Sequence, residues 1–130
     1  MILVSGAFLG FIAVAFGAFA KHGLRESIVD EQFRLLMTAL QYNQLHSVVI
    51  TATGLVLLNG GQLAKILAFR WSGLLFIVGT MLFSFSIYIS VAIKLPSLLN
   101  VTPIGGVTIM AAWILLMVAG VMAKRKLQRI

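Results

Sequence analysis

Long apolar stretches alternate with short polar connections along the whole chain, and this pattern predicts membrane-spanning helices. A helix needs about 20 mostly apolar residues to cross the roughly 30 Å hydrocarbon layer of a bilayer. We place four such spans at residues 3–20, 42–58, 71–93 and 104–123. The sequence therefore predicts an all-α membrane protein, a four-transmembrane-helix bundle that forms one integral membrane domain over residues 1–130.

The main polar segment follows the first span and contains every acidic residue of the chain, namely Glu26, Asp30 and Glu31. Ser27 and Asp30 have the spacing of a helix-capping pair. Apolar and polar side chains then recur on opposite faces of a helical pattern, which is typical of a helix lying at the membrane surface. We expect an amphipathic interfacial helix over residues 27–41 that bends into the second span.

Composition supports a lipid environment. Hydrophobic residues make up 61% of the chain and charged residues 10%, and the mean hydropathy is +1.08, which lies far outside the range of soluble globular proteins. The formal net charge of +7 could suggest nucleic acid as a partner. We expect none, because such a site interleaves basic side chains with exposed aromatic ones, and the aromatic residues here lie mostly within the spans. Zero cysteines exclude thiol redox chemistry and thiolate metal ligation.

The distribution of Lys and Arg predicts the orientation in the membrane. If both termini share one side, that side carries six Lys and Arg residues and the other side carries four. By the positive-inside rule we expect both termini in the cytoplasm. Basic residues that flank the spans are candidates for contacts with lipid headgroups. They are Lys21, Arg25, Lys124, Arg125, Lys126 and Arg129.

Small residues form one face of the first span. Gly6, Gly10, Ala13, Gly17 and Ala20 follow one another at spacings of four, three, four and three. In lipid, such a face lets a neighbouring backbone approach closely and gain dispersion contacts that bulky side chains would prevent. We expect it to pack inside the bundle or between protomers.

Polar residues also recur at helical spacing, on the second and third spans. The stripes are Thr38, Tyr42, His46 and Thr53 on the second, and Thr80, Ser84 and Tyr88 on the third. Both should point inward, because a polar side chain that faces lipid forfeits its hydrogen bonds. One interpretation is a path for protons or small ions centred on His46. The other is interhelical hydrogen bonding that fixes the helix register, which the absence of acidic residues from every predicted span favours.

Other chemistry finds little support in the sequence. His22 ends the first span, where it can cap the last carbonyls or contact a lipid phosphate together with Lys21 and Arg25. Two histidines without a carboxylate or thiolate partner make a weak ligand set, so we expect no metal. No Ser or Thr has an evident base and acid at compatible positions, so we expect neither catalytic residues nor a cofactor.

Four motifs in order are similar to a known family. They are Phe16 to Leu24, Leu40-Gln41-Tyr42 with His46, Leu82 to Tyr88, and Thr102-Pro103-Ile104-Gly105-Gly106. Together they resemble domain-of-unknown-function family 423, also catalogued as uncharacterised protein family 0382. The resemblance covers nearly the whole chain and implies a small helical inner-membrane protein without an established activity. The positions it shares with the family are His22, Tyr42, His46, Ser84, Ser86, Tyr88, Thr102, Pro103, Gly105 and Gly106.

The chain departs from the family pattern at two places. Ala20 and Lys21 replace a glycine and an alanine, and Phe85 stands where the family often has glycine, which narrows any space there. From pattern and resemblance we expect a non-enzymatic membrane protein that packs with lipids, with itself as a homo-oligomer, or in a larger membrane complex. The alternative is a small transporter or channel for protons or small ions. A membrane enzyme acting on lipid or quinone would need a lateral opening lined by His22 or His46.

Overall fold

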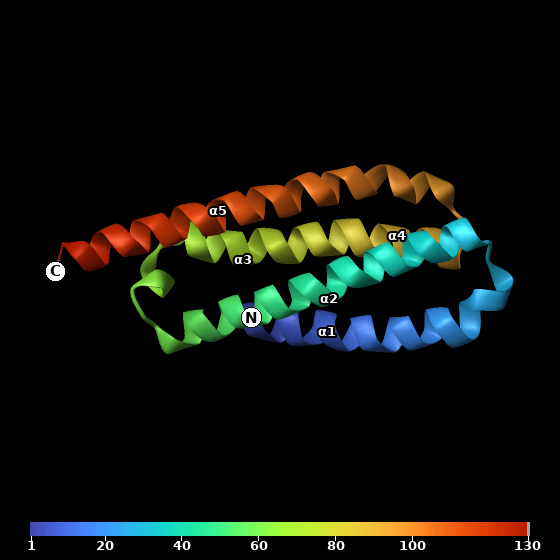
Figure 1. Cartoon of the computed structure of the whole chain (residues 1–130), viewed down its shortest axis with the longest axis horizontal. Helices are drawn as coiled ribbons and strands as arrows, with labels where there is room; N and C mark the ends of the chain where they lie inside the picture. The colour runs from blue at the N-terminus through green and yellow to red at the C-terminus, as the bar shows by residue number, and fades with distance from the viewer. Residues whose placement is uncertain (130) are drawn as a thin grey trace.

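The computed structural model describes residues 1–129, and these residues form helices joined by short turns (Figure 1). The α-helices are α1 (Ile2–Phe19), α2 (Asp30–Asn59), α3 (Leu67–Thr80), α4 (Ser86–Ala92) and α5 (Thr102–Gln128). A π-helical turn, Met81–Phe85, joins α3 to α4 without a break, so that the two form one rod. No strand occurs among the described residues, and the predicted all-α class is confirmed.

Three continuous helical segments are long and apolar enough to cross a membrane. They are Ile2–Ser27, Leu67–Ala92 and Pro96–Gln128, with mean hydropathies of 2.3, 2.2 and 2.2. The first, third and fourth predicted spans fall almost entirely within them. α2 is not among the three, because polar residues in its middle, including Asn43 and His46, lower its hydropathy.

The amphipathic segment is not a separate helix. Its residues from Asp30 onward are the first turns of α2, which continues without interruption through the predicted second span. The apolar side chains of this segment, such as Leu36, are buried with Ala20 and with Ile87 of α4. The structure therefore does not contain the surface helix expected over residues 27–41, because other helices rather than lipid headgroups cover its apolar face.

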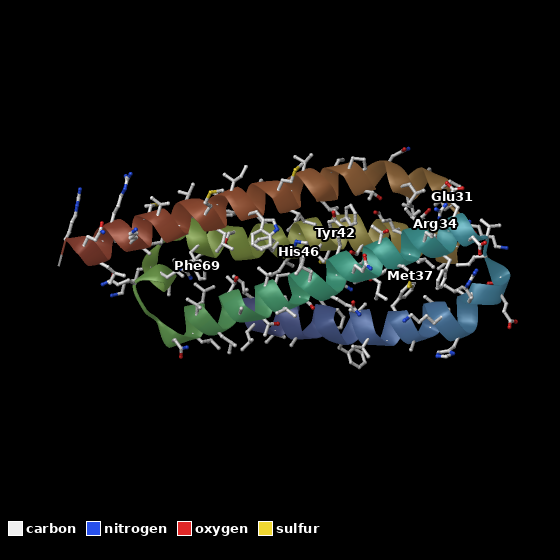
Figure 2. All side chains as sticks on the ribbon, in the orientation of Figure 1. Glu31, Arg34, Met37, Tyr42, His46 and Phe69 are labelled. Carbon is white, nitrogen blue, oxygen red and sulfur yellow. The ribbon has the colours of Figure 1, made fainter. Side chains whose placement is uncertain are left out.

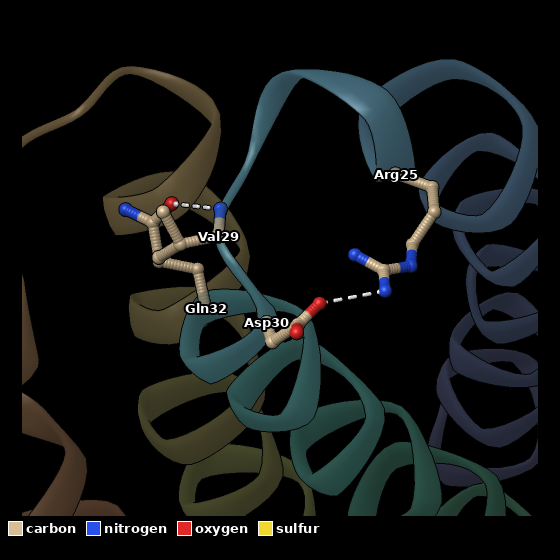
Figure 3. A network of polar contacts seen from close by, with 4 residues as sticks. All are labelled: Arg25, Val29, Asp30 and Gln32. Carbon is tan, nitrogen blue, oxygen red and sulfur yellow. Dashed lines mark hydrogen bonds and ion pairs between the residues drawn. The ribbon is translucent and has the colours of Figure 1, made fainter.

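The start of α2 also differs from the prediction (Figure 3). Val29 is the N-cap, and its backbone N–H donates to the side-chain oxygen of Gln32 at 3.3 Å, which is one half of a capping box. The hydroxyl of Ser27 instead donates to a carbonyl of the preceding turn, so the predicted Ser27–Asp30 capping pair is wrong. Asp30 pairs with Arg25 at 2.7 Å, and its carboxylate lies at the positive end of the helix dipole.

α1 packs antiparallel to α2 through its small-residue face. Leu3 lies against Gly54, Gly6 against Thr51, Gly10 against Ser47 and Gly17 against Leu40. Residue numbers along α1 therefore rise as those of the contacted positions on α2 fall, as in any antiparallel pair. A Cβ atom on Gly6 would lie 2.6 Å from the Thr51 backbone nitrogen, closer than real Cβ contacts. The small-residue face, which includes the buried Ala13, therefore packs within one molecule.

Glycines also bring α5 against the rod formed by α3 and α4. A Cβ atom on Gly79 would lie 2.9 Å from the Ile109 backbone nitrogen, and one on Gly105 would collide with the backbone nitrogen of Phe83. Both obstacles are backbone atoms, which cannot move aside as a flexible side chain could. The neighbouring Gly106 has more room, since its nearest contact would be the Phe83 ring at 3.8 Å.

Three apolar clusters follow one another along the length of the molecule. The first contains Leu36 and Ile87, the second contains Ile50, Phe76 and Ile109, and the third contains Ile66, Phe69 and Ala119. Polar residues, namely Asn43, His46, Thr80 and Ser84, are buried between the first cluster and the second. The core is therefore layered, with a polar level inside an apolar interior.

The two ends of the molecule differ in charge. The α1–α2 and α4–α5 connections lie at one end, and the α2–α3 connection and the tail of α5 lie at the other (Figure 1). The second end, here called the basic end, carries six cationic residues and no acidic residue. They are Lys65, Arg70, Lys124, Arg125, Lys126 and Arg129. All three acidic residues belong to the opposite end, together with four basic ones.

Gly105→Ala should lower the free energy of unfolding by about 1–3 kcal/mol, because the added methyl group forces α5 away from the backbone of Phe83. The matched control is Gly120→Ala on the same helix, where an added Cβ meets nothing within 4 Å. Thermal unfolding of purified protein in one detergent measures both. Equal midpoints for the two variants would contradict the close contact.

Candidate functional site

The buried polar residues form the candidate functional site. Asn43, His46, Thr80, Ser84 and Tyr88, here called the polar layer, are each at most 3% exposed. α2 supplies the first two, and the facing rod of α3 and α4 supplies the others. Figure 2 shows His46 midway along the molecule. The structure thus brings residues of both predicted stripes together between the helices.

His46 is held by one hydrogen bond at each ring nitrogen. Nδ1 lies 2.7 Å from the backbone oxygen of Tyr42, and the indole N–H of Trp113 donates to Nε2 at 3.3 Å. A carbonyl oxygen only accepts and an indole N–H only donates, so the ring must carry its single proton on Nδ1. With both hydrogen bonds formed, the ring is the neutral Nδ1–H tautomer, and protonating Nε2 would break its bond to Trp113.

Ser84 and Tyr88 bind α2 directly. The Ser84 hydroxyl donates to the backbone oxygen of Ala39 at 2.8 Å, and the side-chain amide of Asn43 donates to the Tyr88 hydroxyl at 3.3 Å. The Tyr88 ring also stacks on Phe16 of α1 with 4.1 Å between the ring centres. These contacts tie α4 and the π-helical turn to α2 and α1, which fixes how far one helix can slide along another.

Aromatic rings surround His46 on the side of α3 and α5. Phe76 and Trp113 meet edge to face with their centres 4.9 Å apart, and the His46 ring lies 5.6 Å from Phe76 and 6.2 Å from Trp113. The Tyr42 ring stacks on Phe83 at 4.3 Å, but Tyr42 is 41% exposed. The Tyr42 ring also lies 5.8 Å from the His46 ring, but Tyr42 is exposed and only its backbone oxygen is hydrogen-bonded to His46, unlike the inward relay partner that the stripe predicts.

Two polar atoms of the layer have no hydrogen-bond partner among residues 1–129. They are Oδ1 of Asn43 and the hydroxyl oxygen of Thr80. Both side chains are fully buried. A buried polar atom without a partner costs about 1–3 kcal/mol. These two atoms therefore offset part of the stability that the hydrogen bonds of Ser84 and His46 contribute.

Ser86 and the Thr-Pro-x-Gly-Gly motif at the start of α5, which follow the family pattern, stabilise the connection between α4 and α5. The Ser86 hydroxyl donates to the backbone oxygen of Phe83 at 2.9 Å, so it accepts the hydrogen bond from Thr102 at 2.7 Å. Pro103 lies in the first turn of α5, where a missing N–H costs little. The Thr-Pro-x-Gly-Gly motif therefore begins a helix and lets it approach the rod through Gly105.

The other candidate residues lie apart from the polar layer. His22 is exposed in a π-helical turn, Ala20–Leu24, at the end of the molecule that carries the acidic residues. Lys21 and the basic residues of the tail are also exposed, and Arg25 is engaged by Asp30. His22 and His46 are not brought together, and residues 1–129 contain no group of three or more His, Asp or Glu side chains that could hold a metal.

The sequence reasoning missed Asn43 and Trp113. Asn43 lies three residues before His46, so helical spacing places it on the buried face, where an amide needs a partner. Trp113 lies in the middle of an apolar span instead of at a membrane interface, and a tryptophan N–H there requires an acceptor. Because both residues lie in the middle of apolar spans, a hydrogen bond between Trp113 and His46 could have been predicted from the sequence.

The fold and this interior define a small helical membrane protein. The family model described as "Protein of unknown function (DUF423)" matches residues 16–106, and the chain belongs to this family. It is 34% identical over 124 residues to the UPF0382 inner membrane protein YgdD of Escherichia coli K12, covering 95% of this chain and 92% of that protein. It is 32% identical over 119 residues to the UPF0382 membrane protein YwdK of Bacillus subtilis, covering 92% and 94%. No solved structure matches it.

Ser84→Ala should destabilise the protein by about 0.6–2 kcal/mol, because it removes a buried hydrogen bond between two helices. Thr80→Val is the matched control one turn away, and it should leave stability unchanged or raise it, because the Thr80 hydroxyl has no partner to lose. Both are compared with the parent protein by thermal unfolding. If Thr80→Val costs as much as Ser84→Ala, the Thr80 hydroxyl does have a hydrogen-bond partner.

Proposed function

We propose that this protein is a non-enzymatic, multi-pass component of the inner membrane that acts through its packing with lipids, with copies of itself or with a larger complex. The observation that supports this most is the state of His46, a neutral ring with both nitrogens engaged. A proton carrier needs a nitrogen free to bind and release protons. Three grooves on the surface of residues 1–129 also have linings that do not include His46.

We infer four membrane crossings, and the chain direction supports this. α1 and α3 run in the same direction, so the chain must return across the molecule between them, and α2 makes this return (Figure 1). Its 30 residues correspond to about 45 Å, which exceeds the hydrocarbon thickness. Its polar Asn43 and His46 face the interior, while Leu45 and Val48 are exposed where lipid would lie. α2 can thus cross despite its low hydropathy.

The basic end is proposed to face the cytoplasm. It holds six cationic residues and no acidic one, whereas the opposite end holds four cationic and three acidic residues. Counted by ends of the folded molecule, Lys and Arg divide six to four, as they do along the sequence, and this division is the one that the positive-inside rule uses. Both termini then lie on the cytoplasmic side, where anionic headgroups attract basic segments.

Single-cysteine labelling tests this topology, and the chain has no native cysteine that would interfere. Glu26→Cys and Ser97→Cys should react with a membrane-impermeant maleimide in intact spheroplasts. Gly61→Cys and Gln128→Cys should react only after the membrane is opened, because they lie at the basic end. Labelling of Gly61→Cys from the same side as Glu26→Cys would contradict a crossing by α2.

Reconstitution in liposomes tests the role itself. Vesicles that contain the protein should pass protons no faster than protein-free vesicles when an imposed pH gradient is followed with an internal dye, and His46→Ala should not change that rate. The expectation rests on the closed hydrogen bonding of His46. A proton flux that falls in His46→Ala but persists in Thr53→Val, another buried polar position on α2, would make the protein a transporter.

A further inference from the structure

A groove of about 710 Å³ opens at the basic end, between the start of α1, the end of α2 and the start of α3. Its cause is a difference in helix length. The backbone of Leu3 lies against Gly54, so α1 begins there, whereas α2 continues to Asn59. The volume is within the range of small-ligand sites, about 300–1,000 Å³.

The wall of the groove is apolar and faces outward. Ile2, Leu57, Leu58 and Leu74 line it, and Leu58 is 72% exposed. These side chains lie at the level where α2 leaves the interior, beside the α2–α3 connection. In a membrane such a wall is covered by acyl chains, because an apolar surface of this kind gains nothing from contact with water.

Two cations line the same groove. Lys65 comes from the α2–α3 connection and Arg70 from the first turn of α3. Neither forms an ion pair among residues 1–129, where the single ion pair joins Arg25 to Asp30 at the far end. The groove therefore offers two uncompensated positive charges beside an apolar wall.

We propose that this groove binds one anionic glycerophospholipid, with its phosphate between Lys65 and Arg70 and an acyl chain along Leu57, Leu58 and Leu74. Charge complementarity favours this occupant. A second copy of the chain would bring its own basic end, and a free phosphate would leave the apolar wall uncovered. The inference rests on the proposed function in one respect, because the phospholipid site requires the basic end to lie at a membrane surface.

Native mass spectrometry on nanodiscs tests the proposal. The protein is reconstituted in a mixture of phosphatidylglycerol and phosphatidylcholine, and the lipids that stay bound after the disc is removed are counted. The parent protein should retain one phosphatidylglycerol in preference to phosphatidylcholine. The double variant Lys65→Gln with Arg70→Gln should weaken that preference about 30-fold. Each cation near the membrane surface contributes about 1 kcal/mol, and about 1.4 kcal/mol corresponds to a tenfold change in affinity.

Two further variants separate a site from general attraction. Lys124→Gln with Arg125→Gln removes the same charge from the basic end but outside the groove lining, and it should keep the bound lipid. Ala64→Trp fills the groove and leaves both cations in place, and it should lose the lipid. Thermal unfolding of each variant shows that it is folded.

Three results would overturn the proposal. They are an equal loss in the groove pair and the tail pair, retention of the lipid by Ala64→Trp, and a parent protein without preference for phosphatidylglycerol. Each can occur while cysteine labelling still gives four crossings and liposomes still show no flux dependent on His46. Failure of this inference is thus separate from failure of the proposed function.

Discussion

The structure depends on the need to satisfy polar groups without water. In a bilayer a buried polar group can be satisfied only within the protein, because the hydrocarbon offers no partner. Ser84 meets this need by donating to the backbone oxygen of Ala39 on another helix, and His46 and Trp113 meet it with one bond between their rings. These bonds exist only at one register of α2 against its neighbours. A shift of one turn would leave several polar groups buried without partners.

Two kinds of contact hold the helices together, close packing at glycines and hydrogen bonds in the polar layer. Glycines allow backbone contact within two helix pairs, α1 with α2 and α5 with the rod of α3 and α4. Dispersion dominates there, since lipid gives apolar helices no hydrophobic reason to associate. The polar layer lies where the two pairs meet, and its hydrogen bonds join them. Close packing thus builds the pairs, and polar contacts set their relative position.

Much of the fold could be read from the sequence, but the path of α2 could not. Three of the four predicted spans lie almost entirely within helical segments that are long and apolar enough to cross a membrane, because long uncharged segments have few alternatives. Residues 30–41 look amphipathic because their apolar face is covered by α1 and α4, and sequence periodicity does not say whether protein or lipid covers a face. The glycine face of α1 was recognisable, yet its partner on α2 depended on a register that only the packed helices define.

The candidate site was only partly predictable, for a related reason. Spacing identified His46, Ser84 and Tyr88 as inward-facing, but Tyr42 is 41% exposed, and the buried Asn43 is the α2 residue that donates to Tyr88. An intramembrane histidine is ordinarily a candidate for proton handling. Here a tryptophan from a distant span occupies the nitrogen that a proton would need, so the ring behaves as a neutral aromatic with two fixed polar contacts. Under the proposed packing role of the interior, the groups available to other molecules are those at the surface, and the uncompensated charge among them is concentrated at the basic end.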